Sequence, residues 1–456
     1  MIMAKNYQAD VVVIGAGPGG LAAAVAAARQ GVRVILVERM GYVGGCLAMG
    51  LPLLGYFDAQ ERYVTGGIAQ EVVDRLAAKN GTTGHRLCPM HNSTTIIDPS
   101  ITKIVCIEMA LEAGVQLLLH SELADVEVSD GMIRSVTVVG KGEKIKITGS
   151  VFIDGTGDGD LAYMCGAQYH KGQDGTGEMQ SPTLTFDLGG VELDKLFDYL
   201  DEHPEDFQYC ETMEVKPGYN TAHLRADKNH VFIGMRDTVA RLKAAGKCPI
   251  KRDTLIYINQ MNPGHVQINS IRILDFDGSD VVSLTAGETE SYLTILPLVK
   301  MLQENIPGFE NCYLSYINPV IGVRESRRIQ GIKTLTVDDV LAGSVPNDSV
   351  CLGSFKIDIH AGATDQTIFK YLDHPYGIPY GCTVSQDIGN LMMTGRCISV
   401  DAVAFGSIRI MPTCMAVGQG VGVGAALAVK QGECPAMVST DEIRKTLLNN
   451  GAVLDV

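Results

Sequence analysis

The distribution of hydrophobic and polar residues near the N-terminus predicts a strand, a helix and a second strand in succession. Residues 11–14 form a continuous apolar run, which is typical of a parallel strand buried on both faces. The alanine-rich residues 21–29 predict a helix that ends before Gly31, and residues 32–37 form a second apolar run. This order predicts a βαβ unit and therefore an α/β protein with a parallel sheet.

Glycines fill the turn between the first strand and the helix. Gly15, Gly17 and Gly20 form a G-x-G-x-x-G motif, and Glu38 ends the second strand. Gly15 permits the tight turn, Gly17 lets a pyrophosphate approach the backbone, and Gly20 lets the helix pack closely on the strand. The pyrophosphate would lie at the helix N-terminus, and Glu38 would accept hydrogen bonds from a ribose. Strand, glycines, helix and acid together predict a dinucleotide site.

Three further segments resemble the glutathione-reductase-type flavoproteins. They are ERMGYVGGC at 38–46, VFIDGTGDGD at 151–160 and NLMMTGRCISVDA at 390–402. With GGIAQEVVDRL, ELADVEV, GVRESRR, IDIH and YGIPYG, they resemble the FAD-dependent oxidoreductase family. Asp401 is a further candidate for contact with the cofactor. The fingerprint and the resemblance together imply FAD, bound by Gly15, Gly17, Pro18, Gly19, Gly20, Glu38, Arg39, Gly44, Gly45, Cys46, Ala124, Gly157, Asp158, Gly395, Arg396, Pro412, Thr413 and Cys414.

A second glycine-rich helix is predicted near the C-terminus. Pro412 suits the first turn of a helix, yet glycines recur at 418, 420, 422 and 424, where each costs a helix about 1 kcal/mol relative to alanine. The resemblance implies that this helix points its N-terminus at the flavin, where its dipole would stabilise negative charge. We expect the glycines to allow close packing against the first helix and the cofactor; a plain contact between helices is the alternative.

The fold class that we expect is a Rossmann-like FAD-binding domain of the glutathione-reductase type with an inserted α+β substrate or cap domain. The FAD-binding domain would comprise residues 7–180 and 352–456, and the insertion residues 181–351. Within the insertion, SPTLTFDL and the alternating VQINSIRIL predict strands, and DTVARLKAAGK predicts a helix. Because no second strand–glycine–helix unit occurs, we expect no separate NAD(P)H domain.

Composition narrows the classes of function. The formal net charge is −15, from 37 basic and 52 acidic residues, which argues against nucleic-acid binding. We count no stretch of 18 apolar, uncharged residues, so we expect a cytoplasmic protein without a membrane span. The 12 cysteines are scattered without a CxxC pair, which argues against a metal centre. Assembly into a homo-oligomer stays open.

Candidate catalytic residues are His360, Tyr380 and Arg409. His360 ends the segment SFKIDIH and is able to exchange a proton near pH 7, although it would equally serve to hold Asp358. Tyr380 is a candidate proton donor, with a buried interface tyrosine as the alternative. Arg409 precedes the C-terminal helix and is suited to grip a carboxylate or carbonyl, or to offset flavin charge.

Three arginines and one cysteine are expected to have structural roles, with functional roles as the alternatives. Arg324, Arg327 and Arg328 are expected to form an ion network with Glu325, with anion binding as the alternative. Cys46 follows the glycine pair at the place where disulfide-reducing relatives carry two cysteines, but it has no partner nearby. We expect a packed thiol there; a covalent flavin link or a catalytic thiol is the alternative.

The function that we expect is hydride transfer between flavin N5 and a small organic molecule, with an external electron donor or acceptor. The reaction would saturate or desaturate a C–C bond, or oxidise a C–O or C–N bond. An electron-transfer subunit of a larger complex is the main alternative. An FAD monooxygenase is a less favoured alternative. A halogenase motif with tryptophan is excluded because the chain contains no Trp.

Overall fold

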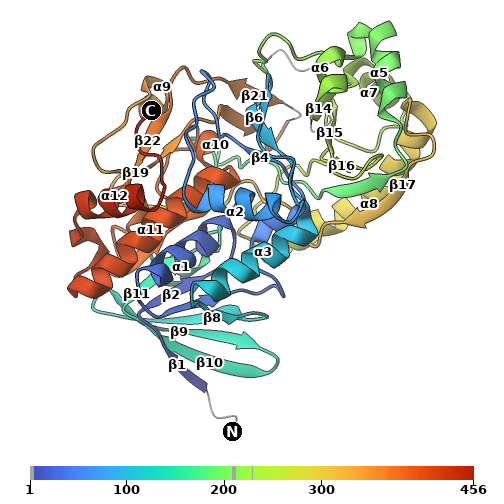
Figure 1. Ribbon diagram of the computed structural model, residues 1–456. Helices are drawn as coiled ribbons and strands as arrows, with labels where there is room; N and C mark the ends of the chain where they lie inside the picture. Colours follow the sequence, from blue (N-terminus) through green and yellow to red (C-terminus); the bar gives the residue numbers. More distant parts are fainter. Residues whose placement is uncertain (1–4, 208–211, 228–229, 365) are drawn as a thin grey trace.

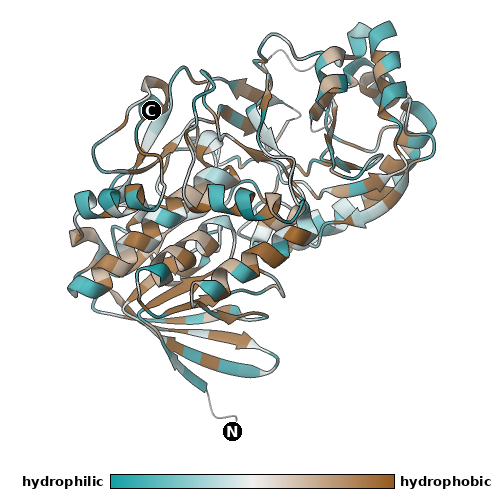
Figure 2. Cartoon of the chain, in the orientation of Figure 1, coloured by the Kyte–Doolittle hydropathy of each residue, from teal (hydrophilic) through white to brown (hydrophobic). Residues whose placement is uncertain are grey.

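The core of the molecule is a five-stranded parallel sheet. The computed structural model describes residues 5–207, 212–227, 230–364 and 366–456 (Figure 1). Every strand pair in the sheet is parallel. The strands in spatial order are β23 (Leu391–Met393), β11 (Val151–Asp154), β2 (Val11–Ile14), β3 (Val34–Val37) and β7 (Gln116–Leu118). All residues of β2, β3, β11 and β23 are buried, which explains their continuous apolar sequences (Figure 2).

Helices cover one face of this sheet. They are α1 (Pro18–Arg29), α3 (Pro99–Glu112) and α11 (Met411–Gln431), and α2 (Ile68–Ala77) and α12 (Thr440–Asn449) pack on these helices. The first predicted helix therefore begins three residues before position 21, and the C-terminal helix begins one residue before Pro412. The crossover from β2 through α1 to β3 is the βαβ unit that the sequence predicts.

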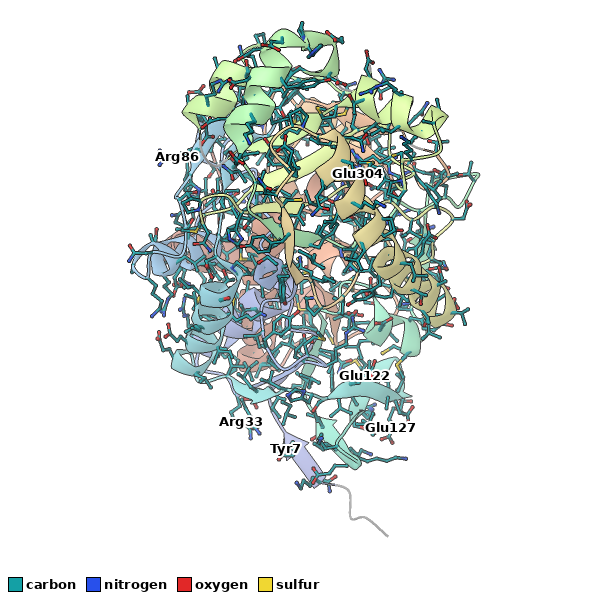
Figure 3. All side chains as sticks on the ribbon, turned by 90° about the vertical axis from the view of Figure 1, so that its right-hand side faces the viewer. Tyr7, Arg33, Arg86, Glu122, Glu127 and Glu304 are labelled. Carbon is teal, nitrogen blue, oxygen red and sulfur yellow. The ribbon has the colours of Figure 1, made fainter. Side chains whose placement is uncertain are left out.

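A four-stranded sheet packs on the opposite side of the parallel sheet (Figure 1). Its order is β1 (Lys5–Gln8), β10 (Glu143–Thr148), β9 (Met132–Gly140) and β8 (Glu122–Ser129). In β10, Ile145 and Ile147 are buried whereas Lys144 and Lys146 are exposed, so one face meets the core and the other meets water. Tyr7 and Glu127 mark this sheet in Figure 3.

Residues between 184 and 323 build a second hydrophobic core, to which Cys88, Met90, Ile96 and Phe369 contribute. Its sheet has the order β14 (Val231–Gly234), β15 (Leu255–Asn259), β16 (Val266–Ile268), β13 (Phe186–Gly189) and β17 (Tyr313–Ile317). The helices are α5 (Leu193–Glu202), α6 (Thr221–Ala226), α7 (Arg236–Ala244) and α8 (Val281–Asn305), on which Glu304 is labelled in Figure 3. The predicted bounds of the inserted domain, 181–351, stay a prediction.

The second sheet is antiparallel at every pairing of its described strands. The described strands of this sheet therefore do not have the parallel βαβ geometry of a dinucleotide fold. The predicted strand at VQINSIRIL is shorter than its alternation suggests, because only Val266–Ile268 pair with neighbours.

Short elements join the two cores. They are α4 (Asp160–Met164), α9 (Val337–Ala342), α10 (Phe405–Ile408), β4 (Leu53–Leu54), β5 (Arg86–Cys88), β6 (Asn92–Thr95), β12 (Tyr169–Lys171), β18 (Arg327–Ile329), β19 (Ser349–Gly353), β20 (Ile357–His360), β21 (Thr367–Lys370) and β22 (Tyr376–Pro379). Among them, β12 pairs with β18, β19 with β22 and β20 with β21.

The four helix glycines of α11 face different neighbours. A Cβ on Gly418 would lie 2.2 Å from the carbonyl oxygen of Gly19, and one on Gly422 would lie 2.2 Å from that of Ala23, so these two glycines let α1 and α11 touch. A Cβ on Gly420 would meet Val350 at 2.8 Å, and one on Gly424 would meet the Tyr380 hydroxyl at 2.6 Å. The expected packing against α1 is therefore made by two glycines of the four.

The most apolar helix of the described structure is α11. Among the described residues, α11 is long and apolar enough to cross a membrane by length and composition alone, because its glycines and alanines count as apolar. Of its most apolar window, 83% is buried inside the fold. The helix is thus a core element of the structure.

Candidate FAD site and its surroundings

A cavity of about 560 Å³ runs from the N-terminus of α1 to the N-terminus of α11. Backbone turns and a few charged side chains make up most of its wall. The sequence-predicted residues that line it are Gly15, Gly17, Pro18, Gly19, Glu38, Arg39, Gly45, Cys46, Gly157, Asp158, Gly395, Arg396, Arg409 and Cys414. Segments that lie up to about 400 residues apart in the chain thus meet around one space.

The glycine turn builds one end of the cavity. Gly15 has a φ of +92°, and a Cβ on it would lie 2.5 Å from the carbonyl oxygen of Gly155. A Cβ on Gly20 would lie 1.9 Å from the Gly15 carbonyl oxygen, whereas one on Gly17 would have no described atom closer than 3.9 Å. Gly20 therefore serves helix–strand contact, and Gly17 leaves open space in front of the N-terminus of α1.

Glu38 is fixed beside this turn. Its Oε2 accepts a hydrogen bond from the Ala16 N–H at 2.8 Å, and its Oε1 accepts one from the Met40 N–H at 2.8 Å. The residue is 8% exposed and lines the cavity. Each carboxylate oxygen keeps a second lone pair, so Glu38 remains able to accept hydrogen bonds from hydroxyl groups of a ligand.

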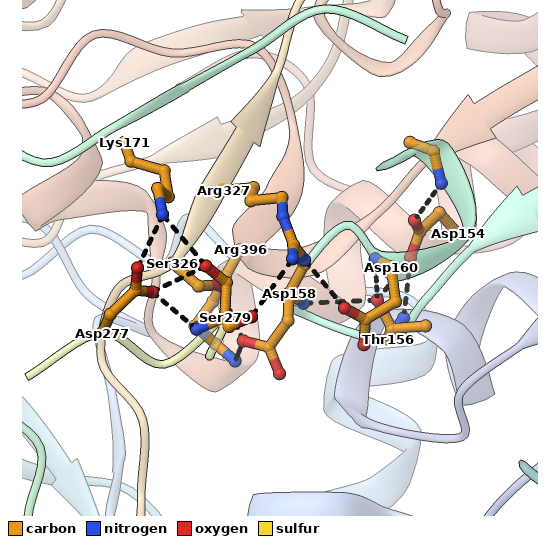
Figure 4. A network of polar contacts seen from close by, with 11 residues as sticks. Asp154, Thr156, Asp158, Asp160, Lys171, Asp277, Ser279, Ser326, Arg327 and Arg396 are labelled. Carbon is orange, nitrogen blue, oxygen red and sulfur yellow. Dashed lines mark hydrogen bonds and ion pairs between the residues drawn. The ribbon is translucent and has the colours of Figure 1, made fainter. Parts of the chain in front are cut away.

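Arg396 and Asp158 lie in the middle of the cavity wall. Arg396 Nη2 donates to Asp158 Oδ1 at 2.9 Å (Figure 4). Arg396 Nη1 and the Thr394 hydroxyl are buried and have no hydrogen-bond partner among the residues that the structure describes. A Cβ on Gly395 would meet nothing within 4 Å. This part of the wall therefore presents unpaired donors next to open space, as a ligand cradle requires.

An ion network joins this wall to the second core. Arg327 Nη1 donates to the Asp158 carbonyl at 3.0 Å and to Asp160 Oδ1 at 2.8 Å (Figure 4). Its guanidinium lies 4.3 Å from the centre of the Tyr163 ring. Arg328 forms a buried ion pair with Glu325. Of the three arginines expected to pair with Glu325, only Arg328 does so. Arg327 pairs with Asp160, and Arg324 donates to the Ser181 carbonyl.

The far end of the cavity is formed by α11 and the residue before it. Met411, Cys414 and Arg409 line it, and α11 has no acidic residue in its first turn. The Thr413 hydroxyl and Arg409 Nε are buried without a hydrogen-bond partner in the described part of the chain. The free N–H groups of a helix N-terminus and a guanidinium therefore converge there, and both favour negative charge.

Arg409 links the cavity to a buried carboxylate. Its Nη2 donates to the Asp358 carbonyl at 2.9 Å and lies 3.4 Å from Asp358 Oδ2. His360 Nε2 lies 3.0 Å from Asp358 Oδ1. Burial raises the pKa of Asp358, but His360 and Arg409 outweigh it and hold the pKa well below its usual range. Asp358 is therefore a carboxylate at neutral pH.

His360 is engaged at both ring nitrogens. Arg272 Nη2 lies 3.2 Å from His360 Nδ1, and because a guanidinium only donates, Nδ1 accepts and the proton resides on Nε2, toward Asp358. Burial lowers the pKa of His360 well below its ordinary value. The ring therefore stays neutral and holds Asp358, the second of the two roles expected for it.

Tyr380 lies away from the cavity, contrary to a role in proton transfer there. Its hydroxyl donates to the Pro435 carbonyl at 3.0 Å, and its ring packs against Gly424 in the interior of α11. Burial raises its pKa well above the ordinary value. The structure therefore gives Tyr380 the packing role that was its alternative.

Other predicted residues do not reach the cavity wall. Gly20 and Gly44 pack against protein, and Pro412 and Thr413 lie behind Met411 and Cys414 in the first turn of α11. Asp401 instead accepts hydrogen bonds from the N–H groups of Val337, Val403 and Ala404.

Ala124 is also outside the cavity wall. It is exposed and unpaired at a bulge of β8, and the cavity instead contacts the residues just before it, 121–123. Sequence reasoning also missed Tyr42 and the loop 320–323, both of which line the cavity. The segment GVRESRR begins within that loop, but its residue types do not indicate that the loop meets the cavity through the tertiary fold.

Cys46 lines the cavity as a single thiol. Burial raises its pKa above the ordinary value, against the opposing influence of Arg396. Cys414 also lines the cavity, and burial raises its pKa to about 12. Both thiols are protonated at neutral pH, and a protonated thiol is a poor nucleophile. The expected packed thiol is therefore the interpretation that these surroundings favour.

The parallel sheet, the glycine turn and the buried acid beside it define a dinucleotide-binding α/β enzyme. A family model described as FAD dependent oxidoreductase matches residues 10–447. The chain therefore belongs to the FAD-dependent oxidoreductase family, and FAD is its cofactor. The open space at Gly17 and Gly395 and the unpaired donor on Arg396 fit such a cofactor.

Individual relatives match parts of the chain. Thiamine thiazole synthase of Aeropyrum pernix is 34% identical over 142 residues, which are 29% of this chain and 45% of that protein. Digeranylgeranylglycerophospholipid reductase 1 of Methanococcoides burtonii is 25% identical over 157 residues, 33% of this chain and 38% of the relative. The chain thus matches less than half the length of either relative.

Among solved structures, a geranylgeranyl bacteriochlorophyll reductase-like protein of Thermoplasma acidophilum superposes with a TM-score of 0.48 at 12% identity. The superposition covers 97% of this chain and 84% of that one.

Proposed function

We propose that this FAD-dependent oxidoreductase transfers a hydride to or from a small organic substrate that binds where the FAD cavity meets the second hydrophobic core. The substrate would gain or lose a C–C double bond, or be oxidised at a C–O or C–N bond. The observation that carries the proposal is the position of Arg409, which lines the cavity and also contacts the buried Asp358.

The residues suited to hold FAD are distributed along the cavity. We propose that the N-terminus of α1 binds the pyrophosphate and that Glu38 binds the adenosine ribose. Arg396, with an unpaired Nη1, would hold the middle of the cofactor. The N-terminus of α11 and Arg409 would face the flavin ring, because they supply the positive field that a reduced flavin needs.

Bound FAD supplies the hydride chemistry, and the chain's own residues supply position and charge. Arg409 would donate hydrogen bonds to an oxygen of the substrate or cofactor, and Asp358 restrains its guanidinium through two contacts. His360 is a positioning residue, since its Nε2 proton faces Asp358 and its Nδ1 accepts from Arg272. The apolar loop 320–323 closes the same end of the cavity and would exclude water.

This proposal includes the finer division of the fold. Residues 7–180 and 352–456 would form an FAD domain of the glutathione-reductase type, and residues 181–351 would form the substrate domain. The separate second core supports this division, and the resemblance of segments 38–46 and 151–160 supports the subtype.

The test is anaerobic reduction of the purified holoenzyme. A panel of candidate alcohols, amines, saturated acids and NAD(P)H is mixed with the protein while the absorbance of oxidised FAD is followed, and the photoreduced enzyme is mixed with unsaturated compounds. The proposal expects at least one organic compound to bleach or restore the flavin within turnover time, with a matching change in that compound. Exchange of electrons only with protein partners, or consumption of oxygen with hydroxylation of an added compound, would contradict it.

A further inference from the structure

A cluster of cationic side chains lies at the end of the FAD cavity beside Arg409. Arg324 directly follows the cavity-lining loop 320–323. Its Nη1 donates to the Ser181 carbonyl at 2.5 Å. Burial lowers the pKa of Arg324, and Arg409, Arg252 and Arg272 act in the same direction, so several guanidinium groups crowd this corner.

The nearby carboxylate of Asp358 lies against two other residues. Its Oδ2 is 3.4 Å from Arg409 Nη2, and its Oδ1 is 3.0 Å from His360 Nε2 but makes no hydrogen bond with a described residue. Within the described ranges, Arg324 forms no ion pair with any carboxylate, and its one hydrogen bond goes to a neutral carbonyl. Arg324 is only partly exposed and forms no ion pair with a described carboxylate, so its guanidinium is available to bind an anion.

The surrounding polar groups leave donors free. Gln180 is 2% exposed; its Oε1 accepts from the His360 N–H at 3.1 Å, whereas its Nε2 has no partner in the described structure. The hydroxyl of Ser181, the residue whose carbonyl binds Arg324, is buried and also without a described partner. Arg409 Nε is a third such donor. A ligand that fits them must be rich in hydrogen-bond acceptors.

We propose that Arg324, together with Gln180 and Arg409, binds an oxyanion group of the substrate. A carboxylate and a phosphate share the chemistry that a guanidinium fork recognises. The inference rests on the proposed function for the location of the substrate, and it narrows the substrate class to organic anions. Arg324 would anchor the anionic end, and Arg409, which lines the cavity, would contact the same group.

The experiment measures binding without turnover. Wild-type holoprotein is titrated at constant ionic strength with acetate, succinate, inorganic phosphate and the neutral acetamide. Binding is followed by the difference spectrum of bound FAD and by calorimetry. We expect at least one oxyanion to bind saturably and acetamide not to bind. Comparison of the affinities of acetate and succinate with that of phosphate shows whether the site prefers a carboxylate or a phosphate.

Variants then test whether the oxyanion binds at Arg324 and Gln180. Arg324→Met should weaken the oxyanion at least tenfold, Arg324→Lys should recover part of the loss, and Gln180→Leu should weaken it severalfold, with FAD content unchanged in all three. Arg134→Met is the matched control, because Arg134 is exposed and pairs with Asp130 on the surface. It should bind like the wild type.

Several results would overturn the inference. They are the absence of binding by every oxyanion, equal binding of acetamide, full binding by both Arg324→Met and Gln180→Leu, or loss of FAD from these variants, which would assign the donors to the cofactor. These readouts need no hydride transfer. A protein that binds oxyanions as expected but exchanges no electrons with organic compounds would therefore contradict the proposed function alone.

Discussion

We expect different effects when two glycines of the same turn, Gly17 and Gly20, are each changed to alanine. In Gly20→Ala the new Cβ would lie 1.9 Å from the Gly15 carbonyl oxygen, inside the protein. In Gly17→Ala the nearest described atom would be the Gly155 carbonyl oxygen at 3.9 Å, and the methyl group would point into the cavity. Gly17 has φ −65° and ψ −176°, which alanine adopts without strain.

The magnitudes follow from these contacts. Real Cβ contacts below 3.0 Å are essentially unknown, so Gly20→Ala must push α1 from the strand by about 1 Å. Overpacking of this kind costs about 1–3 kcal/mol, and the better helix propensity of alanine returns at most about 1 kcal/mol. Gly17→Ala should change the stability of the apoprotein by less than about 0.5 kcal/mol.

The assay combines urea denaturation of the two apoproteins with FAD titration followed by flavin fluorescence. We expect Gly17→Ala to keep the wild-type denaturation midpoint and to bind FAD at least tenfold more weakly, about 1.4 kcal/mol. Gly20→Ala should lose stability in the apoprotein itself. Wild-type FAD affinity in Gly17→Ala would refute the proposal that FAD lies against Gly17. Wild-type stability in Gly20→Ala would refute the close contact between Gly20 and the Gly15 carbonyl.

Three further predictions concern buried charges. Glu38→Arg should purify with little or no FAD, since it removes the ribose acceptor and leaves the Ala16 and Met40 N–H groups unpaired; a full flavin content by absorbance would disprove the contact. Burial raises the pKa of Asp187 to about 6. The folded state then binds more protons than the unfolded state between pH 4 and 6, so wild-type stability should fall relative to Asp187→Asn by about 1–3 kcal/mol as the pH rises from 4 to 7. If urea denaturation gave the same pH dependence of stability for the wild type and Asp187→Asn, this prediction would be contradicted. Burial lowers the pKa of Lys356 to about 7, so the unfolded state binds more protons above pH 7. Wild-type stability should therefore rise relative to Lys356→Met by about 3 kcal/mol between pH 7 and 9.5, and a constant difference would show that the lysine is not buried as described.

Local sequence signals predicted the elements that form the cavity. The buried strand, the glycine turn and the helix at 21–29 were recognisable because backbone conformation and burial impose a residue type at each position. The start of α11 at Pro412 was recognisable for the same reason. These signals act within about 40 residues, and the parts of the fold built by them agree with the structure.

Side-chain direction at long range could not be predicted in this way. The contact of Arg409 with Asp358 joins residues 51 positions apart, and Arg324 separates from Arg327 because the chain turns between them. Periodicity does not determine which helix glycine faces α1 and which faces Tyr380. Of the two roles considered for Tyr380, its contacts with Gly424 and the Pro435 carbonyl favour packing, and the local sequence does not distinguish them.

We propose that the flavin ring lies at the N-terminus of α11 beside Arg409. The measurement that tests it most directly is the reduction potential of bound FAD in Arg409→Ala, with Arg409→Lys as the charge-conserving control. Loss of the cation should lower the potential by on the order of 10–40 mV, which corresponds to about 0.5–2 kcal/mol for two electrons, with FAD content unchanged. Arg409→Lys should restore most of that shift. A potential that is unchanged in Arg409→Ala would place the ring elsewhere and contradict the claim.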